Sequence, residues 1–176
     1  RCRHRHLPGD DAGVAAQHEQ QVLLSRQSFA ELLERLRSCS ARGFQVNDDH
    51  EVTRLLPYAT WQPREDGVAW LTRMTGLVEQ GRARQLVVVR NDDDKVIGTL
   101  LLFNFDPGSA RLEVGYVLGR AHWGRGLMRE ALQAMCSSAF GSLGIRRLEA
   151  EVNSSNVASI RLLRSLGFVH EGTLRK

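Results

Sequence analysis

The second half of the chain is an ordered succession of strand and helix patterns, and that order limits the available folds more than any other feature. Residues 84–90 and 96–103 are apolar runs separated by the turn-forming residues 91–94, which predicts a β-hairpin. Residues 110–118 alternate apolar and polar side chains, which predicts a third strand. Further on, the pattern predicts helices at 127–140 and 157–166 and strands at 147–152 and 168–171. The succession predicts an α/β (α+β) fold in which helices flank a mixed central β-sheet.

The first half of the chain is less regular. Capping-box spacing and helical periodicity predict a helix over 28–38, and shorter patterns predict helices over 51–56 and 63–79. Residues 1–27 are polar and predict no regular element beyond a short helix over 11–21, so we expect this segment to be flexible or irregular. We interpret the whole chain as a single domain, because 176 residues suit one hydrophobic core.

Composition and charge argue against several classes of protein. No apolar run approaches the roughly 18 residues of a membrane span, and no secretory signal follows the basic first residues. Cys2, Cys39 and Cys136 form no close pair, which favours a reducing cytoplasm, and Cys136 is expected in the core. No residues have the spacing of zinc ligands, so we expect no metal. The net charge of +4 permits a polyanionic ligand, either a nucleotide cofactor or a nucleic acid.

A glycine-rich loop, residues 119–126, connects the third predicted strand to the helix at 127–140. Glycines permit a tight turn and a close approach of ligand to backbone, and the free amides at a helix N-terminus favour an anion. Arg125 and Gly126 stand where a P-loop has Lys-Ser/Thr, and Arg129 stands at the third glycine of a Rossmann fingerprint. The loop therefore predicts a phosphate site that belongs to neither of these classes.

Four segments in the second half resemble the GNAT acetyltransferase superfamily. They are EVGYVL at 113–118, HWGRGLMREAL at 122–132, NSSNVAS at 153–159 and LGFVHEG at 166–172. The second segment is similar to the RimJ/RimL branch, which acetylates the N-termini of ribosomal proteins. The resemblance extends over about residues 48–174, and its motifs are specific jointly rather than singly.

This resemblance implies that acetyl-CoA is the co-substrate. In the family, the backbone of the third strand pairs with the pantetheine arm, the amides of the glycine loop hold the pyrophosphate, and an asparagine at the later helix contacts the pantetheine. Arg120, Arg125 and Arg129 either neutralise phosphates or are simply solvated. The implied cofactor-binding residues are Tyr116, Val117, Leu118, His122, Trp123, Gly124, Arg125, Gly126, Leu127, Met128 and Asn156.

Acetyl transfer to an amine requires a base for the nucleophile and a proton for the leaving thiolate. Deprotonating an α-amine at pH 7 costs about 1.1 kcal/mol and a lysine amine about 4.6 kcal/mol, so an α-amine needs only a modest base. Glu113 is the candidate base, with His122 as the alternative. The resemblance implies that Ser159 protonates the thiolate, and the oxyanion donor is expected at the amide of Val117 or a neighbour. We expect direct transfer to a protein N-terminal α-amine or a small-molecule amine.

The sequence departs from the family pattern at three places. Ala121 replaces the usual Gln or Arg before the loop, and Leu163 replaces a tyrosine that often acts as general acid. The family also normally continues with a further strand after the Glu171-Gly172 turn. These departures leave open a catalytically weak module that binds acyl-CoA, and a homodimer in which a second chain supplies the strand. A nucleic-acid partner is disfavoured, because the 11 aromatic residues are scattered and form no stacking motif.

Overall fold

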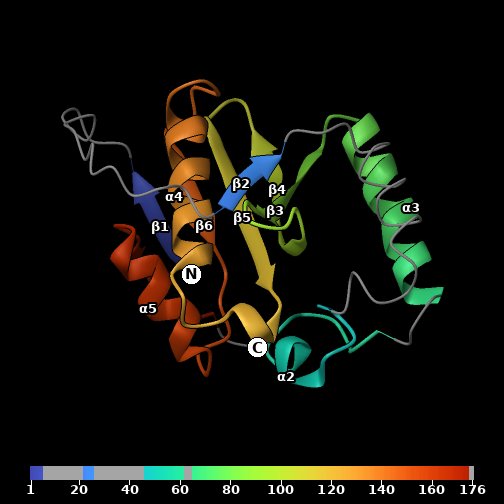
Figure 1. The fold of residues 1–176 in the computed structure, drawn as a ribbon. Helices are drawn as coiled ribbons and strands as arrows, with labels where there is room; N and C mark the ends of the chain where they lie inside the picture. The colour runs from blue at the N-terminus through green and yellow to red at the C-terminus, as the bar shows by residue number, and fades with distance from the viewer. Residues whose placement is uncertain (6–21, 26–45, 62–64, 175–176) are drawn as a thin grey trace.

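The computed structural model describes residues 1–5, 22–25, 46–61 and 65–174, and its centre is one seven-stranded sheet (Figure 1). The strand order is β2-β3-β4-β5-β6-β1-β7. Among the described strands, β5 and β6 are parallel and every other pair is antiparallel, so the predicted mixed sheet is confirmed. The strands are β1 (Cys2–Arg5), β2 (Val22–Ser25), β3 (Ala83–Arg90), β4 (Val96–Asp106), β5 (Arg111–Leu118), β6 (Arg147–Ala150) and β7 (Val169–His170).

Two tight turns join β3, β4 and β5, as the turn-forming residues predict. In the first turn, the Asp93 carboxylate accepts hydrogen bonds from Arg90 and from the amide of Lys95. In the second turn, the Asp106 carboxylate accepts from the amides of Gly108 and Ser109. Carboxylates that bond to nearby backbone amides in this way stabilise turns locally. The turns fix the register of the central strands, and β4 is three residues longer than the sequence predicted.

The helices lie on the sheet as the succession of elements predicts. They are α2 (His50–Thr53), α3 (Glu65–Glu79), the short 3₁₀ helix η1 (Arg120–His122), α4 (Leu127–Phe140) and α5 (Val157–Ser165). Figure 1 shows α4 lying along β5 and β6, with α5 near β1 and α3 at the opposite end of the sheet. The apolar side of α4 packs on β4, β5 and β6 and supplies six of the 18 buried residues of the main core cluster.

The bounds of α4 agree with the prediction, and its apolar side chains are buried or half-buried with one exception. Ala134 is exposed. The buried stripe is centred on Ala131 and Met135, which places Ala134 at its edge, about 100° away around the helix. The buried residues of α4 are Leu127, Met128, Ala131, Leu132, Met135 and Ala139.

Two strands occur where the sequence predicted none, and the expectation of an irregular first segment is wrong for residues 2–5 and 22–25. Strand β1 pairs with both β6 and β7, so a segment of this chain lies beside β7. Cys2 is buried in the core, while the side chain of Arg3 forms ion pairs with Glu149 and Glu171. The charge of this short basic strand is balanced by acidic partners far along the chain, in β6 and just after β7. The helices predicted over 11–21 and 28–38 lie outside the described residues.

Candidate functional site

The loop between β5 and α4 forms an open surface of backbone. Gly124 and Gly126 have positive φ angles of 72° and 78°, a conformation that residues with a side chain rarely adopt. A Cβ atom built on either glycine would meet no other atom within 4 Å. The backbone is therefore directly accessible at both positions, as close contact with a ligand requires.

The N-terminus of α4 opens onto the same surface. Gly126 is the N-cap and supplies no capping side chain. The first amide that bonds back into this helix is that of Glu130, which donates to the Gly126 carbonyl over 3.1 Å. The amides of Leu127, Met128 and Arg129 precede that bond and have no intrahelical acceptor. Such amides, with the helix dipole behind them, bind a phosphate or another anion.

The three arginines of this region differ in what they contact. Arg120 forms an ion pair with Asp49, the N-cap residue of α2, over 2.8 Å. Within the described residues, Arg125 and Arg129 are exposed and have no ion-pair partner. Two of the three guanidinium groups are therefore available to a bound anion, and the third ties the loop to α2.

Strands β5 and β6 separate after three register pairs, of which Glu113 with Glu149 is the last. Beyond that pair β5 continues to Leu118, whereas β6 ends at Ala150. Residues 114–118 therefore have no strand partner on the β6 side. We call this unpaired edge of β5 the strand gap; it leads from the glycine loop back to Glu113.

The hydrogen-bond register shows which backbone groups face the strand gap. The Gly119 amide donates to the Ile97 carbonyl over 2.9 Å, so Gly119 and Ile97 form a hydrogen-bonded pair. Bonded and non-bonded pairs alternate along an antiparallel ladder, so Val117 also points its amide at β4. Tyr116 and Leu118 point their backbone groups into the gap. The Trp123 indole donates to the Leu118 carbonyl over 2.7 Å, so the indole lies at the loop end of the gap.

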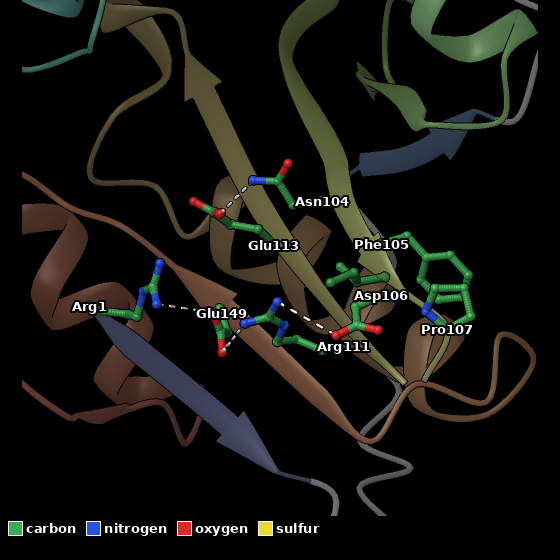
Figure 2. Close-up of a pocket in the computed structure, with 9 residues that line it drawn as sticks. Arg1, Asn104, Phe105, Asp106, Pro107, Arg111, Glu113 and Glu149 are labelled. Carbon is green, nitrogen blue, oxygen red and sulfur yellow. Dashed lines mark hydrogen bonds and ion pairs between the residues drawn. The ribbon is translucent and has the colours of Figure 1, made fainter. Parts of the chain in front are cut away.

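Glu113 lies on the face of β5 away from α4, in a polar cavity of about 450 Å³ (Figure 2). The Asn104 amide donates to the Glu113 carboxylate over 3.1 Å. Partial burial raises the pKa of Glu113 above its usual value, and the hydrogen bond from Asn104 opposes that rise. The cavity is lined by Arg1, Asn104, Phe105, Asp106, Pro107, Arg111, Leu112, Glu113 and Glu149.

Glu149 is the register neighbour of Glu113, but its surroundings are different. Its side chain is only 4% exposed and forms ion pairs with four arginines. The shortest is with Arg147, over 2.8 Å. In contrast, Glu113 has no ion-pair partner among the described residues, so it is the cavity carboxylate that remains available to a cationic ligand. Two of the four arginines that pair with Glu149 belong to residues 1–3, which the sequence did not place near β6.

A pair of hydroxyl groups links the unpaired part of β5 to α5. The Tyr116 hydroxyl is hydrogen-bonded to the Ser159 hydroxyl in the first turn of α5. Burial raises the pKa of Tyr116 to about 12. The Asn156 side chain caps α5 by accepting from the Ser159 amide over 3.1 Å. The sequence singled out Tyr116 for its backbone alone, because nothing local indicates a bond to a residue 43 positions away.

His122 lies at the glycine loop, at the other end of β5 from Glu113. Its ring nitrogen Nδ1 is buried without a hydrogen-bond partner in the part of the chain that the structure describes. Burial, with the nearby positive charges of Arg90 and Arg125, lowers the pKa of His122. The structure therefore separates the two candidate bases and leaves a ring nitrogen of His122 without a partner beside the loop.

The segment before α3 covers the face of the sheet that carries Glu113. Val117 packs there against Val46 and Val52. Further along, the rings of Trp61 and Trp70 contact each other in a tilted arrangement, with centroids 5.5 Å apart and an interplanar angle of 48°. The segment 46–61 therefore covers that face near Val117.

Within the described residues, Cys136 adds no reactive thiol to the site. Burial raises the pKa of the Cys136 thiol to about 12, and its side chain packs on the core, as predicted. Within the described residues, no group of three or more His, Cys, Asp or Glu side chains is arranged to hold a metal ion. Nor does any described helix have the length and apolar character needed to cross a membrane.

Comparison with known proteins gives consistent matches. The family described as "Acetyltransferase (GNAT) domain" matches residues 32–169. The curated relatives include an uncharacterized N-acetyltransferase p20 of Bacillus licheniformis, 36% identical over 74% of both chains. They also include a ribosomal-protein-serine acetyltransferase of Escherichia coli, 28% identical over 57% of this chain and 55% of that protein.

Solved structures match along most of the chain. One is a putative acetyltransferase from T. thermophilus, with a TM-score of 0.67 and 29% identity over 90% of this chain and 78% of that one. Another is a spermidine N-acetyltransferase from Vibrio cholerae in complex with CoA and spermine. Its TM-score is 0.67 at 18% identity, over 88% of this chain and 84% of that one, which shows a shared fold.

Proposed function

Because the chain belongs to the GNAT acetyltransferase family and is an acetyl-CoA-dependent acyltransferase, we propose that it acetylates a primary amine held against Glu113. The observation that carries this proposal is the arrangement along β5. The anion-binding loop, the strand gap and the unpaired carboxylate follow one another along a single strand. This order matches the order of pyrophosphate, pantetheine and acetyl group in the co-substrate.

The glycine loop and the strand gap fit acetyl-CoA. The free amides of Leu127, Met128 and Arg129 would hold the pyrophosphate, and the exposed side chains of Arg125 and Arg129 would add positive charge. The backbone groups of Tyr116 and Leu118 would bond to the pantetheine. The strand from Leu118 back to Glu113 is about 16 Å long at about 3.3 Å per residue. Bound acetyl-CoA supplies an activated acetyl thioester; the residues of this chain orient it and move protons.

Glu113 is the proposed base. Its carboxylate shares the polar cavity with the acceptor amine and would take the proton that the amine loses when it attacks. Its raised pKa makes it a better base than an ordinary carboxylate, which suits an amine that needs only modest help. His122 lies at the loop end of β5. This position suits a contact with the pyrophosphate better than the role of base.

Ser159 is the proposed acid for the leaving thiolate. Alternate residues of a strand face opposite sides, so Glu113 and Tyr116 lie on opposite faces of β5. The Ser159 hydroxyl is hydrogen-bonded to the Tyr116 hydroxyl, so Ser159 lies on the face of β5 opposite Glu113. The amine would lose its proton on one side of the sheet, and the sulfur would gain one on the other.

The oxyanion donor was expected at the amide of Val117 or a neighbour, and the ladder register favours a neighbour. The Val117 amide faces β4 and is part of the ladder, so it is not free to stabilise a negative charge. The neighbouring amides of Tyr116 and Leu118 face the gap, and we assign the donor to one of these.

The acceptor we favour is a monoamine, with the α-amine of a protein N-terminus as the first choice. Glu113 is one carboxylate without a cationic partner among the described residues, which suits one ammonium group better than a polyamine with several. An α-amine is also cheaper to deprotonate than a lysine side chain. The relative that acetylates a ribosomal protein supports this choice and the assignment to the RimJ/RimL branch.

The test is a calorimetric titration with acetyl-CoA followed by thiol-release assays on N-terminal peptides and small amines. We expect micromolar binding and turnover on at least one peptide. Binding without turnover on any amine would instead support the catalytically weak acyl-CoA-binding module. No binding at all would contradict the family's chemistry for this chain.

A further inference from the structure

We propose that the Tyr116 hydroxyl is a positioning and proton-relay partner of Ser159, a role that rests on the proposed function. Tyr116 would hold the Ser159 hydroxyl so that its proton faces the sulfur, and would replace that proton as it leaves. The sequence offers no other tyrosine for this task, because Leu163 stands where the family often has its acid, and Leu163 is fully buried.

The position of the hydroxyl pair is the first support. Strands β5 and β6 separate after Glu113, and Tyr116 lies on the part of β5 that has no partner there. Ser159 comes from the first turn of α5, which follows β6 in the chain. Their hydrogen bond therefore joins α5 to the unpaired part of β5, beside the opening that would receive the pantetheine arm.

The hydrogen-bonding capacity of the two hydroxyls is the second support for the relay. A hydroxyl group has one hydrogen to donate and can accept others. Each hydroxyl of the pair has the other as its one hydrogen-bond partner within the described residues. If Tyr116 donates to Ser159, then the Ser159 hydrogen must point elsewhere, and the gap is the free direction. Removal of the Tyr116 hydroxyl would leave the Ser159 hydrogen without a fixed orientation.

The proton transfers balance among Ser159, Tyr116, Glu113 and water. As the carbon–sulfur bond breaks, its electron pair moves to sulfur, and the Ser159 hydroxyl proton moves to that sulfur. The Tyr116 hydroxyl proton moves to the Ser159 oxygen, since a phenol is a stronger acid than an aliphatic alcohol. Water then returns a proton to the phenolate, while Glu113 releases to water the proton taken from the amine. The net change is one amide and one thiol formed.

A purely structural role for the pair is the rival explanation. Tyr116 could pin α5 against β5 without taking part in proton transfer. That role predicts weaker acetyl-CoA binding or lower thermal stability when the hydroxyl is removed, with no change in the protons that move during the reaction. The two roles therefore differ in what an isotope experiment measures.

The experiment measures single-turnover acetyl transfer in mixtures of H₂O and D₂O, with an amine that the wild-type chain accepts. Two variants remove the pair, Tyr116→Phe and Ser159→Ala. Ser165→Ala is the matched control, because Ser165 is on the same helix and its hydroxyl bonds to the Leu162 carbonyl. Calorimetry with acetyl-CoA reports whether each variant keeps an intact site.

We expect Tyr116→Phe to lose about 10- to 100-fold in rate, within the range of a general-acid contribution. Its acetyl-CoA affinity should stay within about twofold of wild type. A plot of rate against D₂O fraction should be curved for the wild type, since two protons move, and straight for Tyr116→Phe. Ser165→Ala should match the wild type in rate and curvature.

Two results would overturn the relay. One is a Tyr116→Phe rate within about twofold of wild type, and the other is a rate loss with the wild-type curvature retained. A wild-type chain that binds acetyl-CoA but acetylates no amine would instead overturn the proposed function, and the relay would fall with it. The wild-type assay thus separates the two failures.

Discussion

The two faces of β5 differ in chemistry at the point where β5 parts from β6. One face carries Glu113 in a polar cavity among arginines and carboxylates. The other carries the hydroxyls of Tyr116 and Ser159, which are half-buried beside the apolar core. The difference shows how one strand could serve both steps of the proposed acyl transfer. The carboxylate that would accept a proton and the hydroxyl that would donate one lie on opposite faces of the strand, so the proton would not pass directly between them.

The largest effect we expect comes from removing the carboxylate on the first face. Glu113→Gln keeps the size and the hydrogen-bonding capacity of the side chain but cannot accept a proton at neutral pH. The rate of acetyl transfer should fall about 10²- to 10⁴-fold, as for the loss of a general base. Stopped-flow measurement of thiol release at saturating acetyl-CoA checks this.

The control for that variant is the affinity for acetyl-CoA, which should not change if Glu113 contacts the acceptor and not the nucleotide, as we propose. A Glu113→Gln rate within a few-fold of wild type would remove Glu113 from the role of base. Attention would then move to His122 or to a base supplied by water.

The next largest effect concerns the glycine loop, residues 119–126, which we propose binds the pyrophosphate of acetyl-CoA. Gly124→Glu places a carboxylate on the glycine loop and forces a side chain into a positive φ of 72°. We expect acetyl-CoA affinity to fall at least 100-fold. Gly144→Glu is the matched control, because Gly144 has a similar φ of 63° and equally open surroundings at the far end of α4. Equal losses in the two variants would show strain rather than repulsion of the pyrophosphate.

A smaller effect concerns stability and distinguishes Glu149 from its register neighbour Glu113 on the same face of the sheet. Glu149→Gln removes the negative charge that four arginines share. The free energy of unfolding should fall by about 1–3 kcal/mol, less than for a fully buried pair because the arginines are partly exposed. Denaturant titration measures it. If Glu149→Gln left stability unchanged while Glu113→Gln lowered it, the roles assigned to these two residues would be exchanged.

The smallest effect concerns pH. The carboxylate of Glu113 must be ionised to accept a proton, so activity falls as the pH drops through its pKa. The hydrogen bond from Asn104 lowers that pKa, so its removal should raise the pKa and move the acidic limb of the profile to higher pH. Asn104→Gly is the suitable change, because Asn104 has a positive φ of 52° that glycine tolerates. A limb that moves to lower pH would contradict this assignment.

Local sequence patterns were sufficient to predict the glycine loop and the strands and helix around it. The helix α4 was predicted with its observed bounds because a glycine stands at each end and the apolar spacing between them is regular. The three central strands followed from alternation and turn residues. The branch of the family, the acceptor and the roles of Glu113 and Ser159 stay predictions.

Distant contacts explain what the sequence missed. Strand β1 looks like a polar arm because its stabilising partners, Glu149 and Glu171, are far along the chain. The burial of Glu149 depends on the same contacts. The Tyr116 side chain escaped notice because its partner comes from another element. The choice between the Val117 amide and its neighbours depends on the ladder register, which the sequence does not give. Hydrophobic periodicity indicates on which face of a helix or strand a residue lies, but not which residues of other elements it contacts.

The measurement that tests the account most directly is a crystal structure of the wild-type chain with a non-reactive acetyl-CoA analogue. The account predicts the pyrophosphate on the amides at the start of α4 and the pantetheine in the gap between β5 and β6. It also predicts the sulfur on the Ser159 side of β5, with Glu113 on the other side. A sulfur that lies on the same side as Glu113, or a coenzyme that lies outside the gap, would contradict it.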